Sequence, residues 1–175
     1  SGTAVLPRRA SMPSVVKPAN SGSSYGVTLA RDFFTFQEAV RHAFSYSPLI
    51  IIEEYVRGKE ATVGVVDRLR NEAFYRLPPV EIVVQSTMGI FSYEAKYETP
   101  AEERCPGSFS SRESSQLQEV AEVVHKTLGL RHYSRSDCIV TPQGVYFLEV
   151  NALPGLTENS LLPKALQAVG VSTPE

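Results

Sequence analysis

Residues 133–162 read YSRSDCIVTPQGVYFLEVNALPGLTENSLL, with two alternating runs on either side of Thr141-Pro142-Gln143. A period of two is typical of β-strands, so we predict a β-hairpin, then a Gly/Pro loop and the start of a helix. The period groups Tyr133, Arg135, Asp137 and Ile139 on one face of the first arm, and Val145, Phe147, Glu149 and Asn151 on one face of the second. Tyr146, Leu148 and Val150 then lie on the opposite face of the second arm.

The length of the turn decides whether the two odd-numbered faces lie on the same side of the hairpin. An odd number of loop residues around residues 141–143 would bring them together, because a shift of one residue reverses the face of every side chain. Arg135, Asp137, Glu149 and Asn151 would then lie side by side on one surface of a sheet.

This set of polar side chains predicts a metal site. Two carboxylates and an amide oxygen are hard oxygen donors suited to Mg²⁺ or Mn²⁺, and a guanidinium lies beside them. The alternative is a plain polar hairpin face with a cross-strand Arg–Glu pair. The opposite face carries apolar residues suited to a core, so this face is the polar one of the two. That contrast favours the metal interpretation.

The composition of the 175-residue chain is that of a globular protein with one domain or two small lobes. Hydrophobic residues make up 42% and charged residues 21%, and the net charge of −2 provides no basic surface for nucleic acid or anionic membrane. No apolar run approaches the roughly 20 residues of a membrane span, and no signal peptide is apparent. Two cysteines, Cys105 and Cys138, are too few for a disulfide framework. We therefore expect a soluble, cytoplasmic protein without nucleic-acid or membrane partners.

The amino-terminal part of the chain contains a candidate phosphate-binding loop. Residues 1–11 are irregular, and residues 12–19 form a short strand that includes Lys17. The Gly/Ser loop of residues 20–27 is rich in backbone and hydroxyl donors and could fold over phosphates beside that lysine. Gly/Ser content alone more often marks a simple hairpin turn. A helix follows over residues 36–46, with Thr35 as its N-cap and Glu38 completing a capping box.

Two further strands carry carboxylates around a tight connection at Gly58. In residues 48–56 the apolar run is followed by Glu53 and Glu54, and residues 60–67 begin with Glu60. Such a segment can offer backbone groups to an adenine edge and a carboxylate to ribose hydroxyls. The alternative is that these residues are solvated hairpin ends.

The remaining segments complete an α+β chain. Residues 73–84 predict a strand interrupted by Pro78-Pro79, which belongs at an edge or a bulge. Residues 85–107 lack sustained periodicity, which is typical of an active-site lid or of a disordered segment. The two phenols and the lysine of residues 93–97 favour the lid. Helices are expected over residues 112–128, capped by Ser110 or Ser111, and over residues 160–169. Strands and helices alternate without a regular βαβ order, which favours the α+β class.

Four segments together resemble the ATP-grasp domain of D-alanine–D-alanine ligase. They are VVKPANSGSSYGV from residue 15, IIEEYVRGKEATVGV from residue 51, YEAKY from residue 93, and YSRSDCIV with VYFLEVNALPGLTENSLLPKA from residues 133 and 145. They occur in the family's order and close to its spacing, from residue 12 to about residue 168. The resemblance implies an ATP-grasp fold, in which two α+β lobes with mainly antiparallel sheets grip ATP between them.

The resemblance also implies a role for individual residues. Lys17, Ser23 and Ser24 match the nucleotide-phosphate residues, Glu53, Glu54 and Val56 the adenine-reading segment, and Glu60 the ribose ligand. Lys96 and Tyr97 match the catalytic lid, Arg135 the oxyanion stabiliser, and Ser23 also a residue that orients substrate. Asp137, Glu149 and Asn151 match the ligands of two Mg²⁺ or Mn²⁺ ions. Gly155, Ser160 and Leu161 match the wall that receives the carboxylate of the second D-alanine.

The implied function is ATP-dependent formation of D-alanyl-D-alanine for peptidoglycan synthesis. We expect a smaller lobe over residues 12–67 and a larger lobe over residues 68–175, containing the lid and the hairpin. The family's preceding substrate domain is absent from this sequence, so we expect a fragment or truncated form that is incomplete as an enzyme and monomeric, although the family is usually dimeric. One alternative is an ATP-binding module without ligase activity. The other is a different ATP-grasp ligase such as a D-alanine–D-lactate ligase, but in the resemblance Tyr97 favours an amine as the second nucleophile and therefore the dipeptide product.

Overall fold

The computed structural model describes residues 11–20, 24–83 and 102–172, and the chain divides into two compact units. Unit 1 comprises residues 1–56 and 84–100, and unit 2 comprises residues 57–83 and 101–175. The first boundary therefore falls at residue 56, whereas the sequence placed the end of the smaller lobe at residue 67. The reason is that the strand after this boundary pairs with the hairpin of unit 2 along most of its length.

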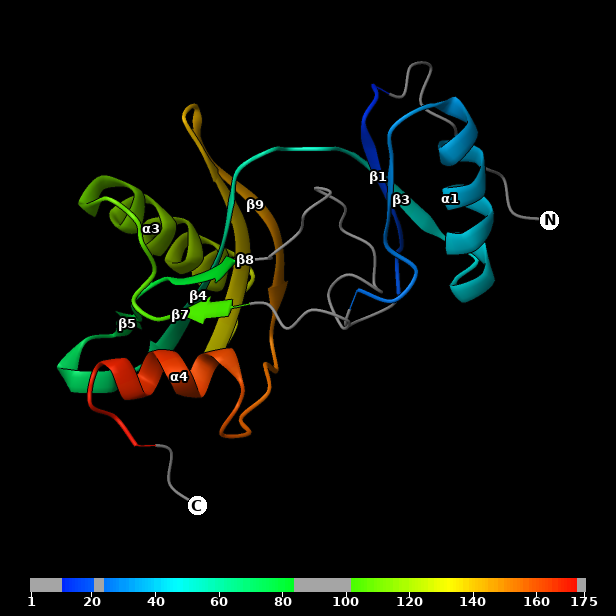
Figure 1. The fold of residues 1–175 in the computed structure, drawn as a ribbon. Coiled ribbons are helices and arrows are strands. Elements are labelled where there is room, and N and C mark those ends of the chain that lie inside the picture. The colour runs from blue at the N-terminus through cyan, green and yellow to red at the C-terminus, as the bar shows by residue number, and fades with distance from the viewer. Residues whose placement is uncertain (1–10, 21–23, 84–101, 173–175) are drawn as a thin grey trace. The chain divides into compact units, whose positions relative to one another are not determined.

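Unit 1 is a small antiparallel sheet with one helix on it (Figure 1). In its described residues, β1 (Ser14–Pro18) lies between β2 (Thr28–Ala30) and β3 (Ile50–Glu54). Helix α1 (Phe33–Tyr46) covers one face, where it buries an apolar core of Val16, Ala30, Phe36, Ala39 and Ala43. The alternation of β1 decides which side chains join that core: Val16 is inside, and Lys17 is on the opposite face.

The start of α1 differs from the sequence prediction. Asp32 is the N-cap, and its carboxylate accepts a hydrogen bond of 2.8 Å from the backbone N–H of Thr35. Thr35, predicted as the cap, is the third helical residue and completes the capping box itself. Phe44 is 42% exposed, because the buried stripe of α1 runs through Phe36, Ala39 and Ala43.

Unit 2 is built on a larger antiparallel sheet (Figure 1). Its described strands are ordered β7-β6-β4-β8-β9, with β5 also pairing with β4. Their bounds are β4 (Lys59–Asp67), β5 (Phe74–Arg76), β6 (Val80–Val83), β7 (Glu102–Arg104), β8 (Tyr133–Thr141) and β9 (Gly144–Asn151). A short 3₁₀ helix, η1 (Leu69–Asn71), links β4 to β5. Residues 102–104, predicted as part of the lid, are thus a strand of this sheet.

Helices cover parts of both faces of this larger sheet. On one face, Ala61, Val63 and Val65 of β4 pack with Leu117 and Ala121 of α3 (Ser111–Thr127). Gly64 points to the other face, where a Cβ atom would lie 2.5 Å from Leu162 Cδ1 of α4 (Leu161–Ala168). The absence of a side chain at residue 64 therefore lets α4 pack closely on β4.

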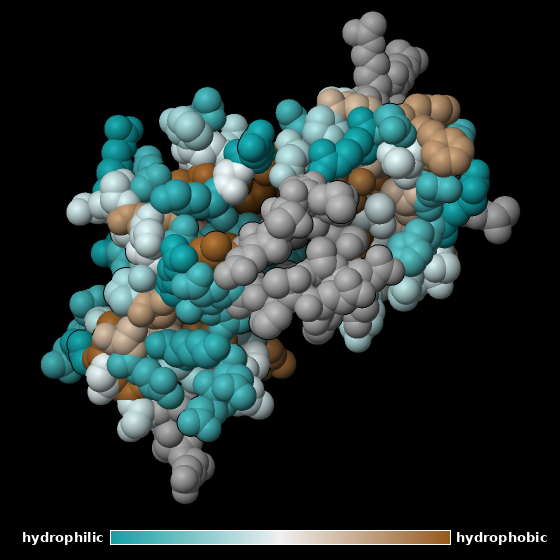
Figure 2. Space-filling model, in the orientation of Figure 1, coloured by the Kyte–Doolittle hydropathy of each residue, from teal (hydrophilic) through white to brown (hydrophobic). Residues whose placement is uncertain are grey.

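The two helices of unit 2 agree closely with the predicted segments. Ser110 caps α3 in a capping box with Glu113, and Gly129 follows the helix with a φ of +61°. Leu128 lies at the C-cap of α3 and is 58% exposed. The buried residues of α4 pack against Leu77 and Val80. The opposite, outer side of the helix is hydrophilic (Figure 2).

Both described sheets are antiparallel throughout, so the predicted α+β class is confirmed. Within residues 11–20, 24–83 and 102–172, no helix combines the length and apolarity that crossing a bilayer requires.

Candidate functional site

The β8–β9 hairpin brings the predicted metal residues together, but by a different route from the one expected. Its turn has two residues, Pro142 and Gln143, because Thr141 pairs with Gly144. This even number pairs Cys138 with Phe147, so odd-numbered residues lie opposite even-numbered ones near the turn. A β-bulge then places the extra residue Leu148 in β9 and shifts the register by one.

Beyond the bulge, Asp137 pairs with Glu149 and Arg135 pairs with Asn151. The predicted polar face is therefore confirmed for these four residues. It is wrong for Val145 and Phe147, which pair with Val140 and Cys138 on the face that α3 covers. The bulge, and not the turn length, is what aligns the carboxylates.

Asp137 is the centre of this polar face. Its Oδ1 accepts hydrogen bonds from Arg135 Nε at 3.1 Å and from Thr62 Oγ1 at 2.6 Å. Its Oδ2 lies 3.1 Å from Arg135 Nη2 and 3.5 Å from Asn151 Nδ2. Arg135 thus binds Asp137 in a two-point ion pair, and this pairing replaces the cross-strand Arg–Glu pair of the alternative interpretation.

The residues on this face fit a hard divalent cation. The Glu149 carboxylate is exposed and makes no hydrogen bond or ion pair within the described part of the chain. Asn151 and Asp137 supply the other oxygens, and oxygen-only donor sets suit Mg²⁺ and Mn²⁺. Among described residues no group of three or more His, Cys, Asp or Glu side chains is placed to hold a metal, so the set consists of two carboxylates and an amide.

Strand β4 adds two residues to the same face. Thr62 pairs with Asp137, and Glu60 pairs with Ile139, so both point to the side that carries the hairpin carboxylates. Glu60 was predicted as a ribose ligand, whereas Thr62 was missed. The alternation of residues 60–67 puts Thr62 on the face of Glu60, which is the signal that could have found it.

In unit 1, two of the predicted ATP residues form an ion pair. Lys17 Nζ lies 2.9 Å from Glu53 Oε1, with side-chain exposures of 16% and 35%. Val15 pairs with Glu53, so Lys17 lies diagonally across from it on the face that α1 leaves uncovered. Glu54 is on the α1 side at the end of β3 and is exposed.

The neighbouring ATP-binding candidates lie outside regular structure or outside the described residues. Val56 follows β3 in an irregular segment, and Ser24 has a φ of +60° next to the loop. Ser23, Lys96 and Tyr97 lie outside the described residues.

The loop before α4 places the predicted substrate residues together. Ser160 is the N-cap of α4, and a Cβ atom on Gly155 would lie 2.7 Å from its Oγ. The loop is closed by a 2.8 Å hydrogen bond between the hydroxyls of Thr157 and Ser160. Leu161, the first residue of α4, is half-buried against the α4 core. Glycine at residue 155 therefore permits the close approach that this loop requires.

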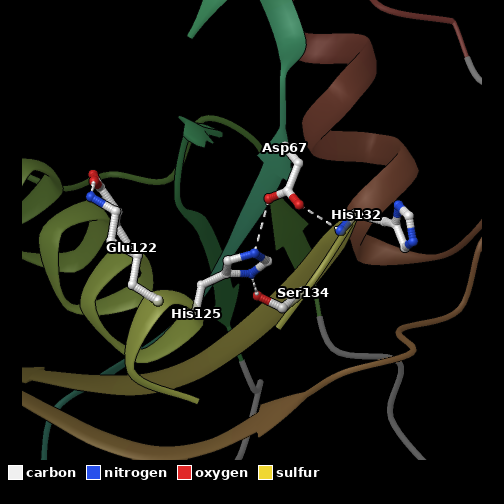
Figure 3. A network of polar contacts seen from close by, with 6 residues as sticks. Asp67, Glu122, His125, His132 and Ser134 are labelled. Atoms are coloured by element: carbon white, nitrogen blue, oxygen red, sulfur yellow. Dashed lines mark hydrogen bonds and ion pairs between the residues drawn. The ribbon is translucent and has the colours of Figure 1, made fainter. Parts of the chain in front are cut away.

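A buried Asp–His–Ser network was missed by the sequence analysis (Figure 3). His125 of α3 contacts Ser134 Oγ at 2.7 Å through Nδ1 and Asp67 Oδ1 at 3.0 Å through Nε2. Asp67 Oδ2 also accepts a 2.7 Å hydrogen bond from the backbone N–H of His132. His125 and Ser134 are both 0% exposed, so no substrate can reach the serine, and the network joins α3 to β4 and β8.

The face opposite the carboxylates is apolar, and this changes the chemistry of Cys138. Burial, and to a lesser extent the charge of Asp137, raises the pKa of the Cys138 thiol to about 12. Cys138 is therefore a protonated, buried part of the core.

Comparison with known proteins gives one consistent family. The family model described as the D-ala D-ala ligase C-terminus matches residues 3–175. A D-alanine–D-alanine ligase of Syntrophobacter fumaroxidans is 38% identical over 166 residues, which cover 94% of this chain and 52% of that protein. This chain spans about half the length of the curated relatives it matches.

Solved structures agree in fold. The D-Ala:D-Ser ligase VanG of Enterococcus faecalis has a TM-score of 0.78 and 31% identity, covering 91% of this chain and 46% of that one. The D-alanine–D-alanine ligase of Bacillus anthracis complexed with ATP has a TM-score of 0.73 and 27% identity, covering 92% and 48%. The fold, the polar face of the hairpin and the family match thus lead to one conclusion: the chain belongs to the family of the D-alanine–D-alanine ligase C-terminal domain, with an ATP-grasp fold.

Proposed function

We propose that this chain is the ATP-binding and metal-binding part of a D-alanine–D-alanine ligase, a cytoplasmic enzyme of peptidoglycan precursor synthesis. The observation that carries the proposal is the alignment of Arg135, Asp137, Glu149 and Asn151 on one sheet face, in a chain that the family model matches over residues 3–175. A solved relative of the same fold is an ATP complex, which supports ATP as the nucleotide.

The proposed reaction has two steps, because a carboxylate and an amine do not condense in water. A carboxylate oxygen of the first D-alanine attacks the γ-phosphorus of ATP, ADP leaves, and an acyl phosphate forms. The amine of the second D-alanine then attacks the acyl carbon. The carbon–oxygen bond to phosphate breaks, phosphate leaves with its electron pair, and the nitrogen loses a proton as the amide forms.

Cationic side chains of the chain fit the charge that this reaction develops. Lys17 places an ammonium on the open face of the small sheet, where we assign it to nucleotide phosphates. We assign the Arg135 guanidinium to the oxygen of the tetrahedral centre, and losing such a donor costs roughly 10²–10³ in rate. Bound Mg²⁺ or Mn²⁺ would neutralise phosphate charge, held by Asp137, Glu149 and Asn151.

The remaining assignments follow the same proposal. We assign Glu60 to the ribose, and Glu53, Glu54 and Val56 to the adenine. Gly155, Ser160 and Leu161 are assigned to the carboxylate of the second D-alanine, at the start of α4 where backbone N–H groups are available. Ser23, Ser24, Lys96 and Tyr97 complete the phosphate loop and the lid.

Calorimetric titration of the 175-residue chain with ATP and Mg²⁺ tests the binding part of the proposal. We expect saturable binding that requires the metal. A chain that is folded by circular dichroism but gives no heat at millimolar ATP would contradict it.

Phosphate release by the intact protein that carries this chain tests the ligase part. With ATP, Mg²⁺ and millimolar D-alanine, we expect release that depends on D-alanine. Nucleotide binding without any release would instead support a nucleotide-binding module without ligase activity.

The second substrate needs its own comparison, because one structural relative is a D-Ala:D-Ser ligase. Assays would offer D-alanine, D-serine and D-lactate in turn beside the first D-alanine, with mass spectrometry of the product. We expect D-alanyl-D-alanine to dominate. A dominant ester with D-lactate, or a dominant D-serine product, would reassign the specificity.

A further inference from the structure

Thr62 lies directly across the sheet from Asp137, yet no role follows for it from the reaction itself. Its Oγ1 is 2.6 Å from Asp137 Oδ1 and 3.3 Å from the backbone oxygen of Ser136. A hydroxyl has one proton to donate, and the short distance to a carboxylate is that of a charge-assisted hydrogen bond. The proton of Thr62 is therefore directed at Asp137.

From this geometry we infer that Thr62 is a positioning residue, which orients the Asp137 carboxylate for a divalent cation. The inference rests on the proposed metal function of Asp137. Strand β4 would then contribute a residue to a metal site whose predicted ligands all belong to the β8–β9 hairpin.

The backbone and side chain of Thr62 are both held firmly. The residue pairs with Val80 of β6 on one side and with Asp137 of β8 on the other. It is only 1% exposed, and its branched Cβ restricts rotation about χ1. A donor fixed in this way keeps its direction whether or not other groups move.

Arg135, the other donor to Asp137, differs in this respect. Its guanidinium reaches Asp137 at the end of a long, unbranched side chain that is 20% exposed, whereas the Thr62 hydroxyl is attached directly to Cβ. Arg135 can therefore leave the carboxylate when a cation and substrates bind, and its assigned role in the reaction requires this. Thr62 then remains as the donor on Oδ1.

The consequence is a preferred orientation of the carboxylate. With Thr62 on Oδ1, the second oxygen Oδ2 is presented toward Asn151, whose Nδ2 lies 3.5 Å away. Residues that hydrogen-bond a metal ligand typically contribute about 10–100-fold to metal affinity. Thr62 is expected to act in that range, without contacting the metal or the substrate.

The test compares Thr62→Val, which removes only the hydroxyl, with Thr62→Ser, which keeps it. The 175-residue chain would be saturated with a non-hydrolysable ATP analogue, and Mn²⁺ affinity measured from the electron paramagnetic resonance signal of free Mn²⁺. We expect Thr62→Val to bind Mn²⁺ about 10–100-fold more weakly. Thr62→Ser should recover most of the wild-type affinity.

Thr141→Val is the matched control. Thr141, at the end of β8, is nearly buried like Thr62 and is 9% exposed. Its hydroxyl contacts the hairpin turn, at 3.1 Å from Gly144 O and from Gln143 N. It should lower the melting temperature about as much as Thr62→Val while leaving Mn²⁺ affinity unchanged.

Two results would overturn the inference, and they are distinguishable. Wild-type chain that binds no Mn²⁺ would remove the proposed metal site and this inference with it. Wild-type affinity for Mn²⁺ in Thr62→Val, or equal weakening in Thr141→Val, would overturn the inference alone and leave the metal site standing.

Discussion

Glu149 offers the cleanest single test of the polar face, because its carboxylate has no partner in the described part of the chain. Glu149→Gln should leave the melting temperature nearly unchanged. Metal affinity in the presence of nucleotide should fall by about tenfold or more, because a charged oxygen ligand is lost. Calorimetry with Mn²⁺ measures this.

Glu119→Gln is the control for that variant, since Glu119 is an exposed carboxylate on α3. It should bind metal as the wild type does. If Glu149→Gln binds metal with wild-type affinity, the hairpin face is only a polar surface.

The two cysteines should differ in reactivity at pH 8. Cys138 is 1% exposed with a pKa raised to about 12, whereas Cys105 is partly exposed with its pKa raised by partial burial. A thiol reagent such as Ellman's reagent should therefore modify Cys105 slowly in the native protein and leave Cys138 intact. Cys105→Ser should abolish the native reaction, and both thiols should react after unfolding.

The raised pKa of Cys138 also predicts a loss of stability in alkali. From its ordinary pKa of 9.0, the unfolded thiol ionises first as pH rises, while the folded thiol keeps its proton until about pH 12. The free energy of unfolding should therefore fall between about pH 9 and 12 and be unaffected by this group below pH 9. Urea melts at pH 8 and 10 should show a smaller loss in Cys138→Ala than in the wild type; an equal loss would contradict the assignment.

At the scale of elements, Leu117 is one of the buried residues that attach helix α3 to the larger sheet. Its side chain is 0% exposed in the cluster that contains Val63 and Val140. Leu117→Ala should lower the free energy of unfolding by about 2–5 kcal/mol, through lost burial and the cavity that remains. Denaturant melts measure the change.

Val123→Ala on the same helix is the control, because Val123 is 55% exposed. It should change the free energy of unfolding by no more than about 0.5 kcal/mol. Equal effects of the two substitutions would mean that the buried face of α3 is misassigned.

The hairpin shows how far an element can be predicted from its alternation. The two strands and their polar residues were correct, because a period of two is visible in the sequence. The turn length and the bulge at Leu148 were not, because nothing in the local pattern distinguishes an extra residue in a strand from a longer turn. The even-numbered turn shifts the pairing by one residue, and the bulge at Leu148 shifts it back. The expected pairing is therefore restored at Asp137 and Glu149, but not at Val145 and Phe147, which lie between the turn and the bulge.

At the scale of the whole molecule, the residues assigned to Mg-ATP are distributed over both units. Lys17 belongs to unit 1, whereas Glu149 belongs to unit 2. Lys17→Met should weaken nucleotide binding roughly 10- to 100-fold, the equivalent of one lost hydrogen bond to a charged group. Nucleotide titration in the presence of Mg²⁺ measures this.

Lys126→Met, which changes an exposed lysine on α3, is the control and should bind nucleotide normally. If Lys17→Met binds Mg-ATP with wild-type affinity, Lys17 serves only its ion pair with Glu53.

The sequence by itself determined the α+β class, most of the described helices and strands, and the residue types of the polar face. These follow from local periodicity, capping residues and side-chain chemistry, which are properties of neighbouring residues. The same local information suggested that a metal face lies on the hairpin, and the family resemblance supplied its proposed ligand, ATP.

Only the tertiary structure decided which distant residues join that face. Thr62 and Asp137 meet because β4 pairs with β8, and His125 meets Asp67 and Ser134 because α3 packs across both strands. Strand pairing between segments far apart in the chain depends on the whole fold, since many registers satisfy the same alternation. For the same reason β4 belongs to unit 2 and carries Thr62 to the polar face of the hairpin, which the local sequence could not show.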